Sequence, residues 1–409
     1  MARVLDRSSA QGIEDCFSES YEEARTKFCN AASESNAELH SLEITRDESG
    51  KYTTDIAIVR GSGQGLVVIS SGTHGVEGYA GSAVQVSLLK HLKGSAVSPT
   101  VVFVHAVNPY GMAHFRRWNE NNVDLNRNAL FPYQFKKLVQ EDRLESTYMG
   151  FDALFNPRSP PGWFYRNIGI WFTMAANIAR YGLRSLKTAL VAATYRQSKG
   201  VFYGGQELQP SHALLRDFMA THFSQVKASF VAWIDVHTGL GPCGVDVLLG
   251  SGKDVDELDG LFPRLPGVFD GFQSVAPKET DEILKLRCQE RQEAGSSGSM
   301  NQSAGYEFSV GLISNEWITK FFKADSGRAL VVTQEFGTRG NLAVARALML
   351  ENAGYHYDRK NHEFWRSFTR DAFYVRTPKW KTSILARGKD VFTKMVARTE
   401  AVSPYSESY

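Results

Sequence analysis

The segment 72–78, Gly-Thr-His-Gly-Val-Glu-Gly, carries two side chains that are common at metal centres. His74 and Glu77 lie three residues apart, so on a turn that enters a helix they face the same way. An imidazole and a carboxylate on one side supply two of the three protein ligands of a His₂Glu zinc site. Because the His-x-x-Glu spacing also occurs by chance, it indicates a metal only weakly when taken alone.

A second histidine occurs in the segment 235–239, Asp-Val-His-Thr-Gly, directly after an apolar run. A single histidine at the end of a strand is more often structural than functional. His237 would nevertheless supply the third ligand, and the fourth position would then be left for water, as a catalytic zinc site requires.

A glutamate closes another apolar run, in the segment 334–338, Gln-Glu-Phe-Gly-Thr. Such a carboxylate, taken alone, is usually a solvated strand end. Beside a metal, however, Glu335 would be placed to accept a proton from a water molecule.

The segment 117–128 reads Arg-Trp-Asn-Glu-Asn-Asn-Val-Asp-Leu-Asn-Arg-Asn. The guanidinium group of an arginine is a planar fork that matches a carboxylate. A surface loop with incidental charges is the simpler interpretation, but the string Asp-Leu-Asn-Arg-Asn is unusually specific. It favours a substrate that carries a carboxylate.

Short, β-branched, apolar runs come before these segments and predict strands buried on both faces of a parallel sheet. They are residues 65–70, 100–107, 229–236 and 329–334. Helical patterns over 78–92 and 210–223 lie between them, and a more polar strand pair is expected at 41–47 and 54–60. The sequence therefore predicts an α/β fold, with a mostly parallel (mixed) sheet and helices on both faces. Ligands bind outside the carboxyl ends of such strands, which is where His74 and His237 are expected.

The chain has 409 residues and a mass of 45.5 kDa. At roughly 100–200 residues per domain this allows two domains or one large α/β domain. We predict a single domain over 1–409 with an aromatic-rich helical insertion at 131–209. Within it, 168–194 is the most apolar long stretch, which we interpret as a packed helix; the alternative is a helix on a membrane surface. Three basic residues interrupt it, so no membrane span is expected.

Composition narrows the possible partners and compartment. The 46 basic and 44 acidic side chains leave a formal charge of +2, which argues against a dedicated nucleic-acid binder. The four cysteines form no Cys-x-x-Cys pair and no disulfide framework. The N-terminal segment contains no apolar run of the signal-peptide kind. These features predict a cytoplasmic protein with reduced thiols.

Taken together, these pieces resemble the M14 zinc carboxypeptidase superfamily, and within it the DUF2817 branch. The resemblance spans most of residues 17–340, with the pieces in family order: 17–28, 73–78, 108–111 (Asn-Pro-Tyr-Gly), 117–128, 203–211, 235–242 and 334–338. It implies one Zn²⁺ per chain, held by His74, Glu77 and His237. Asp124 would accept a hydrogen bond from the other ring nitrogen of His74 and so fix its tautomer.

The resemblance also implies catalytic and substrate-binding roles. Glu335 would be the general base and then the general acid, and Arg117 would polarise the scissile carbonyl. Asn126 and Arg127 would bind the free carboxylate of the substrate. No motif marks the mobile tyrosine that usually closes on the substrate in carboxypeptidases, and Tyr306 is the candidate.

The expected activity is zinc-dependent hydrolysis of an amide bond next to a free carboxylate, as in a carboxypeptidase-like metallopeptidase acting on a small peptide. Two alternatives stay open. The first is an aspartoacylase-like deacylase of N-acyl amino acids; that group appends a β-rich C-terminal domain, whereas helices are expected here at 342–353, 361–373 and 389–396. The second is a non-catalytic zinc- or ligand-binding protein, against which Glu335 and Arg117 argue.

Overall fold

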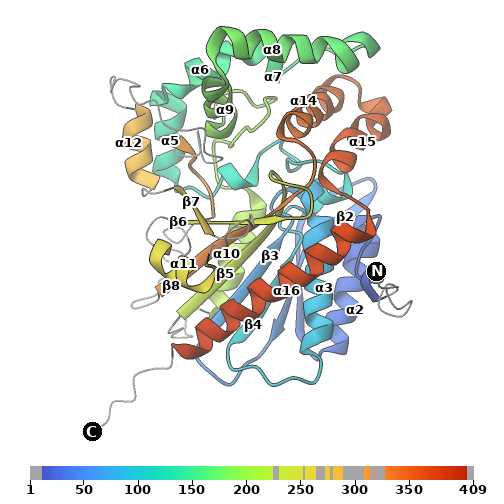
Figure 1. Ribbon diagram of the computed structural model, residues 1–409, viewed down its shortest axis with the longest axis vertical. Coiled ribbons are helices and arrows are strands. Elements are labelled where there is room, and N and C mark those ends of the chain that lie inside the picture. Colours follow the sequence, from blue (N-terminus) through green and yellow to red (C-terminus); the bar gives the residue numbers. More distant parts are fainter. Residues whose placement is uncertain are drawn as a thin grey trace, which may run out of the picture.

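A computed structural model describes residues 12–223, 230–251, 254–263, 272–276, 280–288, 308–313, 318 and 328–402. Its centre is an eight-stranded sheet in the order β1-β2-β4-β3-β5-β8-β6-β7 (Figure 1). The strands are β1 Glu38–Asp47, β2 Gly50–Val59, β3 Leu66–Ser71, β4 Thr100–His105, β5 Phe230–Gly239, β6 Asp246–Ser251, β7 Phe272–Ala276 and β8 Arg328–Gly337.

The sheet is mixed. The neighbouring strands β4, β3, β5 and β8 run parallel, whereas β1, β2 and β4 pair antiparallel at one edge. At the other edge β6 is antiparallel to β8 and parallel to β7. The predicted α/β class is confirmed, as are the four apolar strands and the more polar β1–β2 pair.

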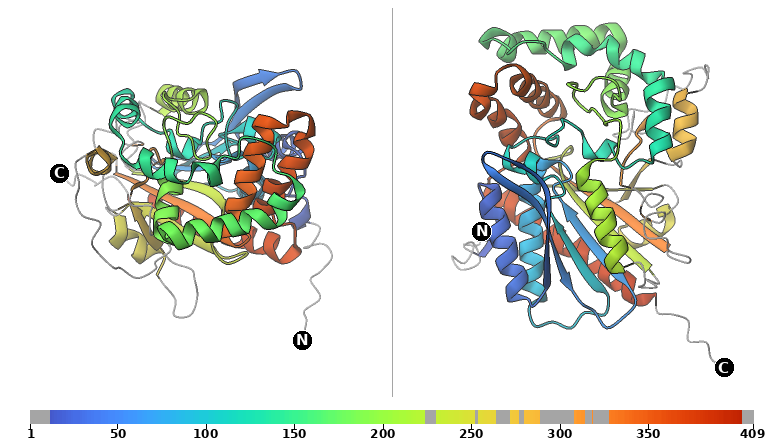
Figure 2. Two further views of the ribbon diagram at one scale, coloured as in Figure 1. Left: turned by 90° about the horizontal axis from the view of Figure 1, so that it is seen from above. Right: turned by 180° about the vertical axis from the view of Figure 1, so that it is seen from behind.

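Helices cover both faces of the sheet because alternate residues of each buried strand face opposite sides. Val67 and Ile69 of β3 belong to one core cluster, which also takes in side chains of α2, α3 and α16. Leu66 and Val68 belong to a second cluster, with side chains of α10. A strand apolar at every position is therefore what a sheet covered on both sides requires; α16 and α3 lie on the near side in Figure 1, and α10 lies on the near side in the rear view of Figure 2.

The helices fall into two groups. Those against the sheet faces are α2 Tyr21–Glu34, α3 Gly78–Leu92, α10 Pro210–Phe223 and α16 Pro378–Ala401. Most of the others lie beyond one end of the sheet (Figure 1): α5 Pro132–Glu141, α6 Leu144–Gly150, α7 Asp152–Phe155, α8 Ile170–Tyr181, α9 Leu183–Ala192, α12 Thr280–Cys288, α14 Asn341–Tyr357 and α15 His362–Phe373. Shorter elements are η1 Gly75–Glu77, α4 Pro109–Ala113, η2 Leu125–Arg127, the π-helical η3 Tyr165–Gly169, α11 Val255–Leu261 and η6 Arg359–Asn361.

Helices α14 to α16 confirm the predicted helical character of the chain after Gly340. Helices α5 to α9 likewise confirm the helical character of 131–209. The description of the chain as one domain with an insertion stays a prediction. The four cysteines are free thiols.

The prediction of one packed helix over 168–194 is wrong. The stretch forms two helices, α8 and α9, separated at Gly182, whose φ of 82° lies in the left-handed region that glycine adopts without strain. One face of α8 is exposed, with Trp171 39% and Phe172 72% accessible. Among the helices that the structure describes, none is long and apolar enough to cross a membrane.

Candidate metal centre

A tight turn between β3 and α3 positions His74 and Glu77. Gly72 has a φ of 67°, and a Cβ there would lie 3.2 Å from the Cα of Ala106. Gly75 packs still closer, since its Cβ would fall 2.0 Å from the carbonyl carbon of Gly111 in α4. Because glycine has no side chain, the backbone of the 72–78 turn can pack directly against the backbone of residues 106–111.

His237 and Glu335 lie inside their strands and not after them as predicted. β5 continues to Gly239 and β8 to Gly337, because the parallel pairing between them persists and sets His237 opposite Glu335. Paired residues on neighbouring strands point to the same face. The register therefore brings the third candidate ligand, His237, and the candidate base together.

The side chains of His74, Glu77 and His237 converge on one point. His74 Nδ1 lies 2.9 Å from Glu77 Oε1, and His237 Nδ1 lies 3.0 Å from Glu77 Oε2. The two Nδ1 atoms are 3.1 Å apart, and the three candidate ligand atoms all lie within 4.8 Å of one another. All three residues are buried. Among the described residues this is the one cluster of histidine, cysteine or acidic side chains with the geometry of a metal site.

A carboxylate lies behind each imidazole. His74 Nε2 is 3.1 Å from Asp124 Oδ1, and His237 Nε2 is 2.6 Å from Asp235 Oδ2. A carboxylate only accepts, so each Nε2 carries the hydrogen of the ring, and each Nδ1 would offer a lone pair to a metal once that nitrogen has lost its own proton. Two imidazole lone pairs and one carboxylate form the donor set of a His₂Glu zinc site. The residues present therefore fit zinc.

The pKa values of Glu77 and His237 are shifted by the residues to which each is hydrogen-bonded. Burial raises the pKa of Glu77, but the charges and hydrogen bonds of His74 and His237 outweigh it and hold that pKa below its ordinary value. Burial lowers the pKa of His237, but the charge and hydrogen bond of Asp235 outweigh it, and the pKa lies well above the ordinary value. Charges buried at this depth are tolerated only because each has a bonded partner.

Glu335, like Glu77, accepts a hydrogen bond from a backbone amide of β5 or the residue after it. Its Oε1 accepts a hydrogen bond from the Leu240 amide at 2.9 Å. Burial, followed by the nearby charge of Glu77, raises the pKa of its carboxyl group. A carboxyl group with a raised pKa holds a proton more readily, as a group that accepts and then returns a proton must.

Arg117 joins the cluster from the 116–128 segment. Its Nε donates to Asp124 Oδ2 at 2.9 Å, and its Nη1 lies 3.5 Å from Glu77 Oε1. The guanidinium carbon lies 4.5 Å from the centre of the Phe202 ring. Arg117 thus places a positive charge beside the candidate ligand Glu77, and its guanidinium group lies over the Phe202 ring.

Asn126 and Arg127 lie next to Asp124 but are not oriented alike. The Asn126 side chain is half-buried. The Arg127 side chain is buried, and its Nε donates to Val191 O of α9 at 2.8 Å and its Nη1 to Asn126 O at 2.6 Å. A substrate carboxylate would have to add to or replace these bonds. Tyr306, the candidate tyrosine, lies outside the described residues.

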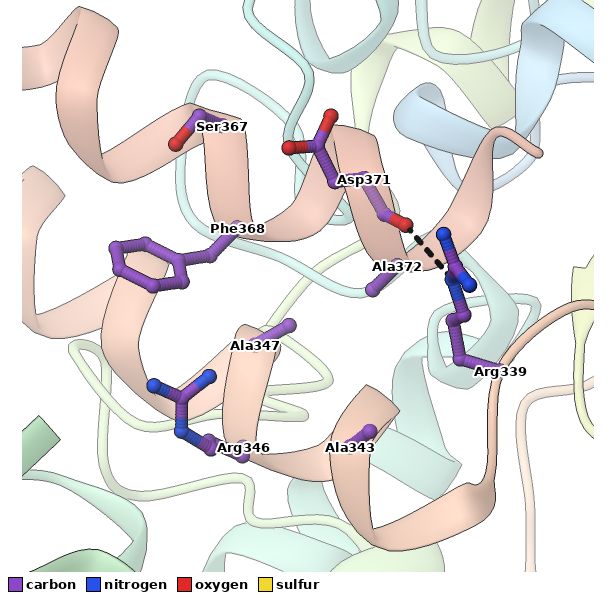
Figure 3. A pocket seen from close by; sticks show the side chains of 8 residues that line it. All are labelled: Arg339, Ala343, Arg346, Ala347, Ser367, Phe368, Asp371 and Ala372. Atoms are coloured by element: carbon purple, nitrogen blue, oxygen red, sulfur yellow. Dashed lines mark hydrogen bonds between the residues drawn. The ribbon is translucent and has the colours of Figure 1, made fainter. Parts of the chain in front are cut away.

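A separate pocket of about 330 Å³ lies between α14 and α15 and contains none of the predicted site residues (Figure 3). Its lining residues are Arg339, Ala343, Arg346, Ala347, Ser367, Phe368, Asp371 and Ala372. Arg339 directly follows the 334–338 motif, and its Nε donates to the backbone oxygen of Asp371 at 3.4 Å.

Sequence reasoning missed two residues of the centre. Asp235 accepts from Ser70 Oγ at 2.7 Å and Thr73 Oγ1 at 3.0 Å as well as contacting His237. The Asp-x-His spacing was its signal, since residues two apart on a strand face the same side. Phe202 had no such signal in the sequence. It belongs to the predicted insertion 131–209, and only the folded chain brings it to Arg117.

Comparison with known proteins gives one family and several distant structures. The family model described as "Protein of unknown function (DUF2817)" matches residues 17–260 and 276–387. A search of curated protein sequences found no match.

The solved structures that are similar to the chain share little sequence with it. A Shewanella frigidimarina protein assigned to the succinylglutamate desuccinylase/aspartoacylase group is 17% identical, with a TM-score of 0.34, over 79% of this chain and 72% of that one. Bovine thrombin-activatable fibrinolysis inhibitor, solved with a tick carboxypeptidase inhibitor, is 13% identical, with a TM-score of 0.41, over 91% of this chain and 99% of that one. At TM-scores below 0.5 these similarities carry no argument about activity.

Proposed function

The chain belongs to the DUF2817 family, as its sequence motifs indicated, and we propose that it is a zinc-dependent hydrolase. Its reaction is the cleavage of an amide bond next to a free carboxylate, as in a carboxypeptidase-like metallopeptidase. The observation that carries the proposal is the convergence of His74, Glu77 and His237, with Glu335 opposite His237 in the sheet register.

In this proposal His74 Nδ1, His237 Nδ1 and the Glu77 carboxylate hold one Zn²⁺. When bound there, zinc would supply Lewis acidity, which polarises a carbonyl group and lowers the pKa of a neighbouring water to about 7. Asp124 and Asp235 keep the two rings in the tautomer and orientation that the metal needs, through the bonds to their Nε2 atoms.

Glu335 is the proposed proton carrier. The Leu240 amide holds Oε1, so Oε2 would take a proton from the attacking water and deliver it to the leaving amine nitrogen. Arg117 would donate to the oxygen that becomes negative as the carbonyl is attacked, because its guanidinium group already lies beside Glu77. Its contact with Phe202 limits its movement.

Asn126 and Arg127 are proposed to bind the substrate carboxylate. Arginine and a carboxylate form two parallel charge-assisted hydrogen bonds when the geometry permits. Arg127 already donates to Val191 O and Asn126 O, and these two bonds fix the orientation in which its guanidinium group would meet the substrate.

An aspartoacylase-like deacylase of N-acyl amino acids ranks second. It uses nearly the same residues, but residues 341–402, where that resemblance expects a β-rich domain, form α14, α15 and α16. A non-catalytic binding protein ranks third, because it needs neither Glu335 nor Arg117 at the metal.

A hydrolysis screen tests the proposal. The purified protein, loaded with zinc, is assayed on an N-blocked dipeptide with a free carboxylate, on its C-terminal amide, and on N-acyl amino acids. We expect cleavage of the free dipeptide, loss of activity with a chelator, and recovery with zinc. Cleavage of N-acyl amino acids alone would favour the deacylase. Stoichiometric zinc without any hydrolysis would favour the binding protein, and well-folded protein that binds no zinc would overturn the proposal.

A further inference from the structure

The helix that contains η3 and α8 lies at one extremity of the molecule, beyond the end of the sheet (Figures 1 and 2). Helical residues run without interruption from Trp163 to Tyr181. Between Trp163 and Phe172, five large apolar side chains are exposed: Trp163 63%, Phe164 65%, Ile168 37%, Trp171 39% and Phe172 72%. This concentration is unlike the scattered single apolar residues of an ordinary protein surface.

The exposed side chains continue as an apolar stripe along the helix. Beyond Phe172 the outward positions are alanines, at 175, 176 and 179, all exposed. The opposite side is apolar as well, with Ile170 and Met174 buried in the main core. A helix on a water-exposed surface normally presents a polar outer face. We call residues 163–179 on the outward side the α8 apolar face.

The stretch of chain that contains this face carries basic but no acidic side chains, and one of its arginines, Arg158, pairs with Asp152 just before the stretch. Residues 153–206 contain no aspartate or glutamate. They contain seven basic residues: Arg158, Arg166, Arg180, Arg184, Lys187, Arg196 and Lys199. Arg180 and Arg184 are exposed just past the end of the α8 apolar face. A partner with negative charge and an apolar interior complements this combination.

We propose that the α8 apolar face docks on the surface of an anionic phospholipid membrane. Tryptophan and phenylalanine on one side of a helix, with lysine and arginine nearby, are the features by which helices lie in the membrane interface. Basic residues near an anionic surface add attraction that salt weakens. The helix lies on the membrane and does not span it, in keeping with its length and interrupted hydropathy. The proposal does not depend on the proposed hydrolase activity.

The area of the face argues against a second copy of the chain as the occupant. A whole aromatic side chain contributes about 150–250 Å², so these exposures amount to roughly 500 Å² of apolar surface. A stable protein interface takes about 800 Å² from each partner. A single convex helix fits better into a headgroup layer, which adapts its shape, than against a rigid protein surface.

The test is sedimentation of the full chain with vesicles of phosphatidylcholine alone or with 30% phosphatidylglycerol. The test variant is Phe164→Ser/Phe172→Ser. The matched control is Leu39→Ser/Leu214→Ser, which removes two exposed leucines on β1 and α10. We expect the wild type and the control to bind the anionic vesicles. The test variant should bind about tenfold or more weakly, with circular dichroism unchanged.

Charge supplies the second arm. Arg180→Glu/Arg184→Glu and raised salt should each reduce binding to the anionic vesicles, while binding to phosphatidylcholine alone stays weaker throughout. Equal binding of wild type and Phe164→Ser/Phe172→Ser would overturn the proposal. It would also be overturned if wild type bound no vesicles, or if light scattering showed a dimer that only the Phe164→Ser/Phe172→Ser variant disrupts.

Discussion

The candidate metal centre and the α8 apolar face both reverse the usual distribution of polarity, but in opposite senses. The centre buries charged and polar side chains, with His74, Glu77 and His237 each less than 5% exposed. The α8 apolar face exposes Phe164 and Phe172 to water, although both are phenylalanines at helical spacing. One region places polar groups inside the protein, and the other places apolar groups outside it.

The difference lies in whether the partners belong to the chain. Each ring nitrogen of His74 and His237 has a partner within hydrogen-bonding distance, supplied by Glu77, Asp124 or Asp235. Buried polar groups are stable only with such partners. On the α8 apolar face the described chain supplies no cover for Phe164 or Phe172. Buried polar side chains that partner one another therefore indicate a site for a small ligand. Exposed apolar side chains that the chain does not cover indicate a partner outside the chain.

Removing a ligand should have the largest effect. His74→Ala and His237→Ala are each expected to lose most of the one zinc per chain and nearly all activity, because two protein ligands hold a catalytic zinc poorly. Elemental analysis after gel filtration measures the loss. His222→Ala, on α10 outside the cluster, is the control and should retain the metal. Stoichiometric zinc in both cluster variants would remove these histidines from the site.

The next effect concerns the proton carrier. Glu335→Gln should reduce turnover by about 10²–10⁴-fold, because an amide cannot accept the proton of the attacking water. Gln retains an oxygen for the Leu240 amide, so the fold and the zinc content should not change. Turnover of the free-carboxylate dipeptide is the measurement. Full activity would exclude Glu335 from the role.

Arg127 tests whether its buried position serves the substrate or the fold. Each charge-assisted bond is worth about 1.5–3 kcal/mol, so Arg127→Ala should weaken binding of the carboxylate substrate about 10²-fold or more. An amidated analogue should be affected much less, and Arg127→Lys should rescue only in part. An equal loss for both substrates, together with a lowered melting temperature, would instead assign Arg127 to holding Val191 of α9.

The carboxylates behind the rings should have a smaller effect. Asp235→Asn is expected to weaken zinc binding about 10–100-fold, since the asparagine amide no longer matches all three donors from His237, Ser70 and Thr73. Titration with a competing chelator gives the affinity. The exposed Asp217→Asn is the control. An unchanged affinity in Asp235→Asn would show that the ring needs no carboxylate to hold it.

The smallest effect is expected at the exposed region. Phe172→Ala in solution without vesicles should change the free energy of unfolding by no more than about 0.5 kcal/mol, as for most surface substitutions. Met174→Ala, on the buried side of the same helix, should cost about 2–5 kcal/mol. Denaturant titration compares the two. A large cost at Phe172 would mean that its ring is covered within the protein, and the contrast between the two regions would disappear.

Much of this molecule could be predicted from local patterns. The helix bounds of α3 and α10 follow from their apolar spacing, and the four apolar runs became parallel neighbours in the sheet. The segments 72–78 and 235–239 were expected at the carboxyl edge of that sheet. Such patterns repeat every two or 3.6 residues, so they are visible without knowledge of the rest of the chain.

The remaining features depend on contacts between distant segments. Asp235 bonds to Ser70 and Thr73 some 160 residues away, Arg127 donates to Val191, and Phe202 supports Arg117. The same holds for the exposure of α8, whose apolar residues predicted a buried helix. The spacing of apolar residues predicts which face of a helix is apolar. Which segment packs against that face depends on the tertiary structure. At the candidate metal centre the chain itself provides the partners; at α8 the tertiary structure leaves the apolar face open.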